Sequence, residues 1–475
     1  MINETTVEEV RKIFDAQSAR RWVVAQSTAQ ERIGKLTRLK DAIVSHRDEL
    51  ADAVHADFRK HAAEFEFTEI FPVVEELNFA IEHLAAWMKP VHAKSTLELV
   101  GARSAVRHEP LGLVLVLAPW NYPFHLAIIP LISAIAAGNC VVLKPSNKTS
   151  NTARVIAKLI SSTFNQDEVA VVTGDHRIAD ALLDQPFDHV FFTGSTAIGK
   201  KIMASAARSL ATVTLELGGK SPAIIDESAD IETSARRVMW GKCTNAGQTC
   251  IAPDYALVHE HVAERFVDAA KKAVETFYGS NPDEWIKNPD YARMIDDAAY
   301  GRVSKLLEGS IVAGARVALG GVTDAGTRYI APTILSGVTP EMPIMSEEIF
   351  GPILPVLTFR NLEEAIALVR RGEKPLALYL FAEDRAVIER VLMSTTSGGT
   401  VVNHVFLHIV NPNIAFGGVG ASGQGNYHGE YGFRTFSHAR AVVEQTTASA
   451  ITLLFPPYET KKSEVTQVVI KRLAS

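Results

Sequence analysis

The sequence predicts an α/β fold with two doubly wound parallel sheets and a small additional β element. Between residues 111 and 217, short apolar runs alternate with stretches of helical periodicity, and a second series of this kind begins near residue 222. Parallel neighbours in a sheet need long crossover connections, which the intervening helices provide. With 475 residues, the chain is also too long for a single hydrophobic core. We therefore expect two α/β domains.

The region before the first series predicts surface helices followed by a β-hairpin. Residues 7–55 have helical apolar spacing, with charged residues on the opposite face. Apolar and polar residues then alternate in 96–100 and in 104–108, and Gly-Ala-Arg at 101–103 separates the two runs. This pattern is typical of two strands joined by a short turn.

The two α/β series give the following elements in order. In the first series we expect strands at 111–117, 140–143, 169–172, 190–192 and 213–217, and helices at 123–137, 151–164, 178–183 and 198–207. In the second series we expect strands at 222–225 and 255–258 and helices at 231–241 and 262–277. Ligands of such sheets bind beyond the carboxyl ends of the strands.

Composition excludes several classes of function. The net charge of −6 gives no electrostatic reason to expect a nucleic-acid partner. Three cysteines without a CxxC pair argue against a disulfide framework or a thiolate zinc site, and we expect a reducing, cytoplasmic location. The charged amino terminus does not resemble a secretory signal. Prolines and asparagines interrupt the most apolar region, 111–143, so we interpret it as buried strand, helix and strand rather than a membrane span.

Cys250 is the candidate nucleophile. A free cysteine is more often a small buried hydrophobe, but Gly247 and Pro253 place this thiol in a turn rather than in a packed helix. Cys140 and Cys243 adjoin apolar helical or strand sequence, so we assign both to the core.

Glu216 and the segment 192–199 are further candidates, each with an ordinary alternative. Glu216 ends an apolar strand before two glycines, where burial would raise its pKa and suit it to accept a proton from water. A surface carboxylate is the alternative. Segment 192–199 runs from a strand into a helix and places Ser195 at a phosphate-binding helix start, or simply at an N-cap. The glycine-rich stretch 416–425 lacks a GK[ST] ending and predicts a tight structural loop.

Taken together, the motifs resemble those of the aldehyde dehydrogenase superfamily in order and spacing. They lie at 119–124, 192–199, 215–222, 247–250, 348–352 and 416–423. The segments at 121–125, 250–255 and 374–379 resemble the class 3, fatty-aldehyde-type branch. The resemblance covers nearly the whole chain and implies two Rossmann-like domains, one binding a cofactor and one catalytic.

This resemblance implies roles for individual residues. Cys250 would attack the aldehyde, Asn121 and the Cys250 N–H would hold the oxyanion, and Glu216 would activate water to hydrolyse the thioester. Tyr122 would line the substrate pocket, and no metal is expected at the site. The residues implied to bind NAD or NADP are Trp120, Lys144, Asn147, Thr193, Gly194, Ser195, Gly199, Leu217, Glu348 and Phe350. Without the resemblance, Glu348 could belong to a solvated face, and Lys144 could merely end a strand.

Asn147 departs from the pattern of many relatives that prefer NAD, which carry a glutamate here. A carboxylate would repel a 2′-phosphate, and neutral Asn147 removes that repulsion. We therefore hypothesise dual use of NAD and NADP, to which Lys148 could contribute. The alternative is that Asn147 is a neutral replacement.

The resemblance also implies a homodimer and a division of the chain. We expect an NAD(P)-binding domain at 1–90 and 107–217, a catalytic domain at 218–422, a bridging and oligomerisation element at 91–106 and 423–447, and a tail at 448–475. The tail contains an amphipathic stretch at 465–473, too short to span a bilayer. We expect it to pack on the protein's own surface; an entrance cap, a subunit contact or a peripheral membrane contact are alternatives.

The sequence thus predicts an NAD(P)-dependent enzyme that oxidises an apolar aliphatic or aromatic aldehyde to its acid. Two rivals remain. A cofactor-independent cysteine esterase would need Cys250 but not Ser195, Lys144 or Glu348, and no histidine is placed beside Cys250 by the sequence. A non-catalytic binding protein of the same fold would have an inert thiol.

Overall fold

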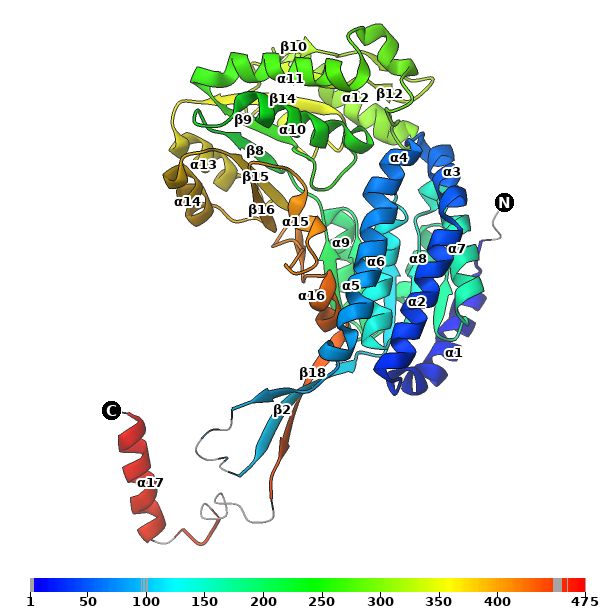
Figure 1. Cartoon of the computed structure of the whole chain (residues 1–475), viewed down its shortest axis with the longest axis vertical. Helices are drawn as coiled ribbons and strands as arrows, with labels where there is room; N and C mark the ends of the chain where they lie inside the picture. The colour runs from blue at the N-terminus through cyan, green and yellow to red at the C-terminus, as the bar shows by residue number, and fades with distance from the viewer. Residues whose placement is uncertain are drawn as a thin grey trace.

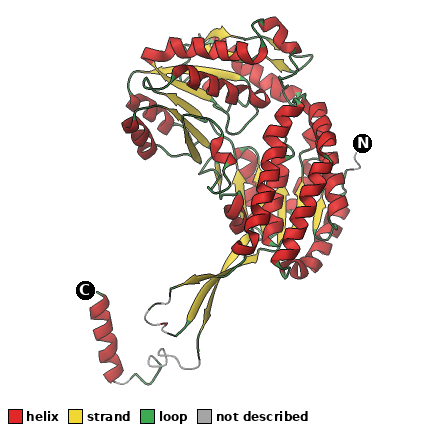
Figure 2. Ribbon diagram, viewed as in Figure 1, coloured by secondary structure: helices red, strands yellow, loops and turns green. Residues whose placement is uncertain are grey.

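Two parallel sheets, each covered by helices on both faces, form the two lobes of the protein (Figures 1 and 2). The computed structural model describes residues 4–94, 96, 99, 101–446, 455–458 and 460–474. The amino-terminal lobe carries the helices coloured blue and cyan, and the other lobe lies above it in Figure 1. This arrangement confirms the predicted α/β class with two doubly wound sheets.

The first sheet has the strand order β17-β7-β6-β3-β4-β5, and all its strands except β17 are parallel. Its strands are β3 (Leu113–Leu117), β4 (Cys140–Lys144), β5 (Val169–Val171), β6 (His189–Thr193), β7 (Thr212–Glu216) and β17 (Gly423–Gln424). From β3 the chain proceeds outward to β4 and β5, then returns to β6 and β7 on the other side. The direction of winding therefore reverses between β3 and β6, where such sheets bind ligands.

Alternating side chains of β3 hold two helical layers against this sheet. Val114 and Val116 belong to the core beneath one layer, while Leu113 and Leu115 belong to the core beneath the other. The strand period of two produces this division, and full burial of each such side chain stabilises the fold by about 1.5–3 kcal/mol. The first layer contains α2 (Ala29–Ser45), α3 (Arg47–Phe58), α5 (Phe71–Trp87), α6 (His125–Ala137) and α7 (Ser150–Thr163), and the second contains α1 (Val7–Ala25), α8 (His176–Leu183) and α9 (Thr196–Ala206).

The connection between α3 and α5 is irregular. A short helix α4 (Ala62–Phe65) continues into the π-helical turn η1 (Glu66–Ile70) before α5 begins. Such π turns occur frequently at functional sites. Here the turn places Glu69 in the interior, as described below.

The second sheet has the order β10-β13-β14-β9-β8-β15-β16, and only the edge strand β10 is antiparallel to its neighbour. Its strands are β8 (Pro222–Ile225), β9 (Tyr255–His259), β10 (Arg316–Leu319), β13 (Thr333–Ser336), β14 (Ile353–Phe359), β15 (Ala377–Phe381) and β16 (Gly399–Val402). Helices α10 (Ile231–Cys243) and α11 (Ala263–Tyr278) cover one face, and α12 (Asp297–Val312), α13 (Leu362–Arg371) and α14 (Arg385–Ser394) cover the other. A small pair, β11 (Thr323–Asp324) and β12 (Tyr329–Ile330), lies outside this sheet.

A third sheet projects from the body as a long ribbon (Figure 1). It consists of β1 (Val91–Ala93), β2 (Arg103–Pro110) and β18 (Ser437–Glu444), all antiparallel. The second strand of the predicted hairpin is therefore correct, whereas the first, at 96–100, lies largely outside the described residues. The partners of β2 are β1 and β18, and local alternation could not identify the distant strand β18.

The remaining described α-helices are α15 (Leu407–Val410), α16 (Gly429–Thr435) and α17 (Thr460–Leu473). Helix α17 stands apart from the two lobes in Figure 1, and Val468 and Ile470 on it are exposed. This differs from the expected packing of the tail on the protein's own surface. Among the residues that the structure describes, no helix is long and apolar enough to cross a bilayer.

Candidate active site

Cys250 follows a turn in which three consecutive residues adopt left-handed backbone conformations. The φ angles are 53° at Asn245, 50° at Ala246 and 75° at Gly247. A Cβ at Gly247 would lie 2.2 Å from the carbonyl oxygen of Gly351, so only glycine fits there. Backbone strain of this kind persists only where surrounding contacts determine it, and it is often found at functional sites.

Gln248 supplies those contacts. Its side chain is fully buried, and its Nε2 donates to the carbonyls of Asn245 and Arg293, both at 3.0 Å. Its Oε1 accepts from the N–H of Ile295 at 2.9 Å. The first bond closes the turn, and the bonds to Arg293 and Ile295 hold it against the segment before α12.

Asn121 lies beside this turn, in the loop that follows β3. Its side-chain Nδ2 donates to the carbonyl of Gln248 at 3.1 Å, and its own carbonyl accepts from Nδ2 of Asn245 at 2.8 Å. The N–H of Asn245 in turn donates to Glu64 at 2.7 Å. One of the two N–H groups of the Asn121 amide is thereby fixed, which orients the other as a donor for a bound oxygen.

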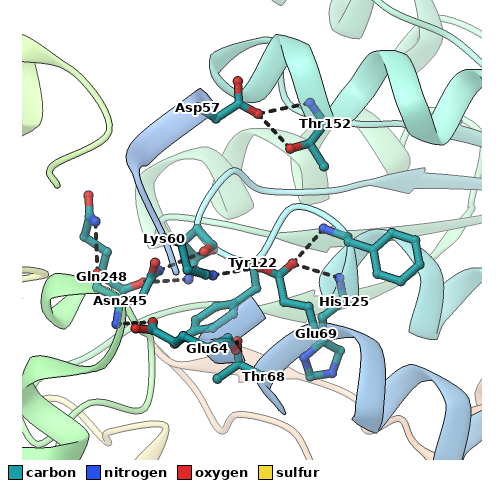
Figure 3. A network of polar contacts seen from close by, with 12 residues as sticks. Asp57, Lys60, Glu64, Thr68, Glu69, Tyr122, His125, Thr152, Asn245 and Gln248 are labelled. Atoms are coloured by element: carbon teal, nitrogen blue, oxygen red, sulfur yellow. Dashed lines mark hydrogen bonds and ion pairs between the residues drawn. The ribbon is translucent and has the colours of Figure 1, made fainter. Parts of the chain in front are cut away.

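A buried ion pair between Lys60 and Glu69, both labelled in Figure 3, supports the same loop. Lys60 Nζ lies 2.7 Å from Glu69 Oε1, and neither side chain is exposed. The other carboxylate oxygen of Glu69 accepts from the N–H groups of Phe124 and His125, at 2.9 and 3.2 Å. Lys60 also lies 4.2 Å from the ring centre of Tyr122. The pair therefore fixes the start of α6 and the loop containing Asn121.

The hydroxyl of Tyr122, predicted to line the substrate pocket, is bound to Thr249 Oγ1 at 2.7 Å. Burial raises the pKa of Tyr122 well above its usual value, so the side chain is a neutral phenol. Tyr122 thus joins the Asn121 loop to the residue that precedes Cys250.

Glu216 ends β7 with its side chain buried. Within the described part of the chain, neither carboxyl oxygen has a hydrogen-bond partner. Burial raises the pKa of Glu216 well above its usual value. Its backbone is held on both sides, because its carbonyl accepts from the N–H of Gly194 at 2.9 Å and Gly423 pairs with it in the sheet. A buried carboxyl group without a partner is suited to exchange a proton with water.

The environment of the Cys250 thiol favours its neutral form. Burial raises the pKa of Cys250, and the negative charges of Glu348 and then Glu216 raise it further, whereas the backbone N–H groups of Cys250 and Ile251 lower it. Both carboxylates therefore act electrostatically on this sulfur. The two other cysteines lie in the core as predicted, since Cys140 and Cys243 are buried.

The start of α9 carries the predicted phosphate-binding residues. Ser195 is the N-cap, yet its side chain makes no capping hydrogen bond in the structure, and Thr193 Oγ1 is buried without a partner among the described residues. A Cβ at Gly199 would lie 2.8 Å from the side chain of Leu217, so glycine permits close packing of the helix on the strand. The first N–H groups of α9 and these hydroxyls are suited to bind an anion.

Glu348 lies where the two lobes meet. It lines a cavity of 490 Å³ together with Gly218, where a Cβ would lie 2.1 Å from Glu348 Oε2. Burial and then the charge of Asp254 raise the pKa of Glu348 to about 8. Asp254 also accepts from the N–H of Ile349 at 2.9 Å and pairs with Lys220 at 2.5 Å, which holds the loop of Glu348 in place.

Two aromatic residues of the predicted set come together. The rings of Trp120 and Phe350 meet edge to face with centres 5.4 Å apart, and Phe350 has a left-handed φ of 48°. Nζ of Lys148 lies over the ring of Trp120, 5.6 Å from its centre. The same ammonium group pairs with Asp296 at 2.6 Å. The structure thus engages Lys148 with Asp296 rather than leaving it free beside Asn147.

Lys144 and Asn147 lie at the carboxyl end of β4. Lys144 is buried, which lowers its pKa, and its Nζ contacts only the carbonyl of Pro145, at 3.5 Å, among the described residues. Asn147 is exposed and lines a cavity of 460 Å³ with Arg154 and several small polar residues. These groups lie at the carboxyl end of a strand in the first sheet, which is where ligands of such sheets bind.

Sequence reasoning missed the buried polar residues that position these groups. Lys60, Glu64, Glu69, Asn245 and Gln248 form a network that spans both lobes (Figure 3). The only sequence pattern that points to this network is the cluster of charges beside apolar residues at 60–69. The same pattern is equally typical of a solvated helix face.

Comparisons with known proteins agree with this geometry. The model of the aldehyde dehydrogenase family matches residues 1–442. The chain is 43% identical to 4,4′-diaponeurosporen-aldehyde dehydrogenase of Staphylococcus aureus over 90% of this chain and 92% of that protein. It is 41% identical to aldehyde dehydrogenase family 3 member B1 of Rattus norvegicus over 99% of this chain and 97% of that protein. Both the predicted family and its class 3 branch are therefore confirmed.

Solved structures extend the similarity to the fold. A structure described as the substrate-bound state of Staphylococcus aureus AldH has a TM-score of 0.93 and 40% identity, covering 97% of this chain and 99% of that one. An NAD-dependent aldehyde dehydrogenase from Sinorhizobium meliloti has a TM-score of 0.86 and 30% identity, covering 96% and 89%. An NADP-dependent enzyme of E. coli has a TM-score of 0.86 and 27% identity, covering 94% and 92%.

Proposed function

Because the chain belongs to the aldehyde dehydrogenase family, we propose that it oxidises apolar aldehydes to carboxylic acids with NAD or NADP. The observation that carries this proposal is the joining of three groups from both lobes. Asn121 is bonded to the turn that carries Cys250, and Glu216 is close enough to raise the pKa of that thiol. This arrangement supplies a nucleophile, an oxyanion donor and a base.

The first step is attack of the Cys250 sulfur on the aldehyde carbon. The free N–H of the Asn121 amide and the backbone N–H of Cys250 donate to the aldehyde oxygen as it becomes negative. These hydrogen bonds offset the cost of forming a charge at a buried site. The buried carboxylates Glu348 and Glu216 disfavour a free thiolate in the resting site, so the thiol proton passes to an ionised one of them as the sulfur attacks. The adduct becomes a thioester of Cys250 by loss of hydride, which a bound nicotinamide would accept.

Glu216 then assists hydrolysis of the thioester. Its unpartnered carboxylate accepts a proton from water while the water oxygen bonds to the thioester carbon. The C–S bond then breaks, which releases the acid, and the sulfur of Cys250 regains a proton. The raised pKa of Glu216 makes it a stronger base when it is ionised, but reduces its ionised fraction at neutral pH.

The residues around the first sheet fit a nicotinamide dinucleotide. A bound nicotinamide would accept the hydride from the substrate carbon. Thr193, Ser195 and the first turn of α9 present unused donors for the pyrophosphate, while Lys144 and Glu348 retain polar atoms for ribose hydroxyls. Similar enzymes described as NAD-dependent and NADP-dependent share the fold, which supports use of either cofactor.

Apolar residues packed near Pro253, three residues after Cys250, support an apolar substrate. The rings of Trp240 and Phe406 meet edge to face at 5.3 Å. A Cβ at Gly241 would contact Pro253, Val405 and Phe406 within 3.4 Å, so these residues lie close together. A relative whose name specifies diaponeurosporen-aldehyde supports the same substrate class.

The three sheets support a proposed division of the chain and its assembly from two copies. We assign cofactor binding to 1–90 with 107–217 and catalysis to 218–422. The expected bridging element, 91–106 and 423–447, overlaps the projecting ribbon but also includes β17 of the first sheet, and β2 continues beyond it to Pro110. The ribbon would join two copies, because its outer strands offer edges on which a second ribbon can pair. Three unpaired cysteines support a reducing cytoplasmic location, and the negative charge supports no nucleic-acid partner.

The test is oxidation of decanal and benzaldehyde by the purified chain, with NAD, with NADP and without cofactor. We expect reduced cofactor to form at its absorbance band and to vanish in Cys250→Ala. Cys243→Ala, which removes a thiol from the core, is the matched control and should retain turnover. Cofactor-independent ester cleavage without cofactor reduction would favour the esterase alternative, and an inert Cys250 would favour a binding protein.

A further inference from the structure

Three potential metal ligands meet at the end of the second sheet opposite Cys250. Glu227 follows β8, His259 ends β9, and His261 lies in the short turn that precedes α11. Strands β8 and β9 are parallel neighbours, so their carboxyl ends lie together. One ligand atom from each of the three residues lies within 4.8 Å of the others. Cys250 precedes β9, so this cluster is separate from the active site.

Two backbone contacts orient the imidazole ring of His259. Its Nε2 lies 3.1 Å from the carbonyl of Arg360, which can only accept, so Nε2 carries the hydrogen. Its Nδ1 lies 3.4 Å from the N–H of His261, which can only donate, so Nδ1 carries a lone pair. Its Nδ1 therefore faces the other two side chains of the cluster, where a bound ion would replace the long contact with the His261 N–H. A histidine that binds a metal commonly has such a backbone partner on its other nitrogen.

Glu227 faces this lone pair with another acceptor. Its Oε2 lies 3.7 Å from Nδ1 of His259 and 2.9 Å from Nδ1 of His261. The first separation is too long for a direct hydrogen bond, whereas the second is within hydrogen-bond distance. A cation among the three ligand atoms could bind all of them.

We propose that Glu227, His259 and His261 form a binding site for a divalent transition-metal ion, with Zn²⁺ as the best match. Two imidazole nitrogens and one carboxylate oxygen suit zinc, whereas calcium and magnesium prefer oxygen ligands alone. Ligand atoms about 2.1 Å from a tetrahedral zinc ion lie roughly 3.4 Å from one another, and the contacts at 2.9 and 3.7 Å bracket this spacing.

The site is preformed on one side and open on the other. His259 is buried, and Phe359 meets its ring edge to face with centres 5.3 Å apart, which fixes the orientation of the imidazole. Glu227 and His261 have 52% and 68% of their side chains exposed, so an ion can enter from solvent and keep a water ligand. A bound ion would tie the loop after β8 to the start of α11 and stabilise the second sheet.

The test is calorimetric titration of the full chain with ZnCl₂ after treatment with a chelator. Cys250→Ser is used as the background, because the active-site thiol can itself bind zinc. We expect one zinc equivalent in this background, and loss of that equivalent in Glu227→Gln and in His261→Ala. His176→Ala is the matched control, because His176 is exposed beside Asp175 but has no third ligand among the described residues.

Unchanged Tm values without metal would establish that the variants are folded, since both substitutions are at exposed side chains. Zinc should raise the Tm of the background protein and not that of His261→Ala. Anomalous scattering from a zinc-soaked crystal should place the ion beside Nδ1 of both histidines. Equal zinc binding by all variants, no binding in the background, or an ion located elsewhere would overturn the proposal.

Discussion

The side-chain amide of Asn121 donates to the carbonyl of Gln248 across 3.1 Å, and this bond crosses from one lobe to the other. Asn121 follows a strand of the first sheet, whereas Gln248 lies in the turn before β9 of the second. The proposed oxyanion donor and the proposed nucleophile therefore keep a fixed relation, although they belong to different sheets. Such preorganisation lets donors act on developing charge without having to move.

Replacing Asn121 by alanine should lower kcat by about 10²–10³-fold with little change in KM, because the lost N–H acts chiefly in the transition state. Steady-state kinetics with decanal would measure both constants. Asn78→Ala, an exposed asparagine that accepts from Lys40, is the control and should behave as wild type. An unchanged kcat in Asn121→Ala would remove this residue from the oxyanion site.

Glu216→Gln should block hydrolysis of the thioester while leaving its formation intact. We expect a burst of about one equivalent of reduced cofactor, followed by turnover lowered by about 10²–10⁴-fold. Rapid-mixing absorbance would record both phases. The exposed Glu373→Gln is the matched control. If Glu216→Gln shows no burst, then Glu216 is needed for formation of the thioester and not only for its hydrolysis.

The raised pKa of Glu216 also predicts a pH dependence of activity and of stability. Only the ionised form is a base, so where hydrolysis limits turnover kcat should rise as the pH increases through the raised pKa. The folded state binds this proton more tightly than the unfolded state does. Its stabilising contribution is therefore complete below the unfolded pKa and is lost as the pH rises through the folded pKa. Urea unfolding of wild type and Glu216→Gln should show a smaller loss at high pH in the variant.

Lys60→Met should reduce the free energy of unfolding by about 3–5 kcal/mol, because it leaves Glu69 as a buried charge without its cation. Chemical denaturation would measure this value. Arg265→Met breaks the exposed pair with Glu232 and should cost less than about 1 kcal/mol. Similar losses of unfolding free energy in the two variants would show that the buried pair stabilises the fold no more than the exposed pair does.

Asn147→Glu should lower kcat/KM with NADP by about tenfold or more, which corresponds to ~1.4 kcal/mol, while preserving activity with NAD. The introduced carboxylate would repel a 2′-phosphate in the cavity beside Arg154. Lys148→Ala is the comparison variant. Because Lys148 already pairs with Asp296, its removal should change kcat/KM with NADP less than Asn147→Glu does. A large NAD preference in the wild-type chain would contradict the dual-cofactor hypothesis.

Local sequence patterns predicted the strands and helices of the two sheets well, and the reason is physical. A strand such as β3 is buried on both faces and reads as an apolar run, while α7 keeps a clear apolar stripe at helical spacing. Such signals are contained within a few residues. The approximate bounds of these elements therefore follow from the sequence alone.

Long-range contacts were beyond such patterns. Nothing local to Lys60 or Glu69 indicates that the two charges are buried together, and the pairing of β2 with β18 joins segments far apart in the chain. The individual roles at the candidate site came from resemblance to a family. The structure adds the buried network that positions Asn121, and it also shows that Lys148 pairs elsewhere.

The short strand β17 has a consequence for how the protein is made. It covers the outer edge of β7 beside Glu216, yet its residues come long after the rest of the first sheet. During synthesis, the ribosome completes that sheet's other strands while this edge is still bare. An uncovered edge is a site for association with other chains. The amino-terminal lobe thus depends on translation of residues 423–424, about 200 residues after β7, before its last strand is in place.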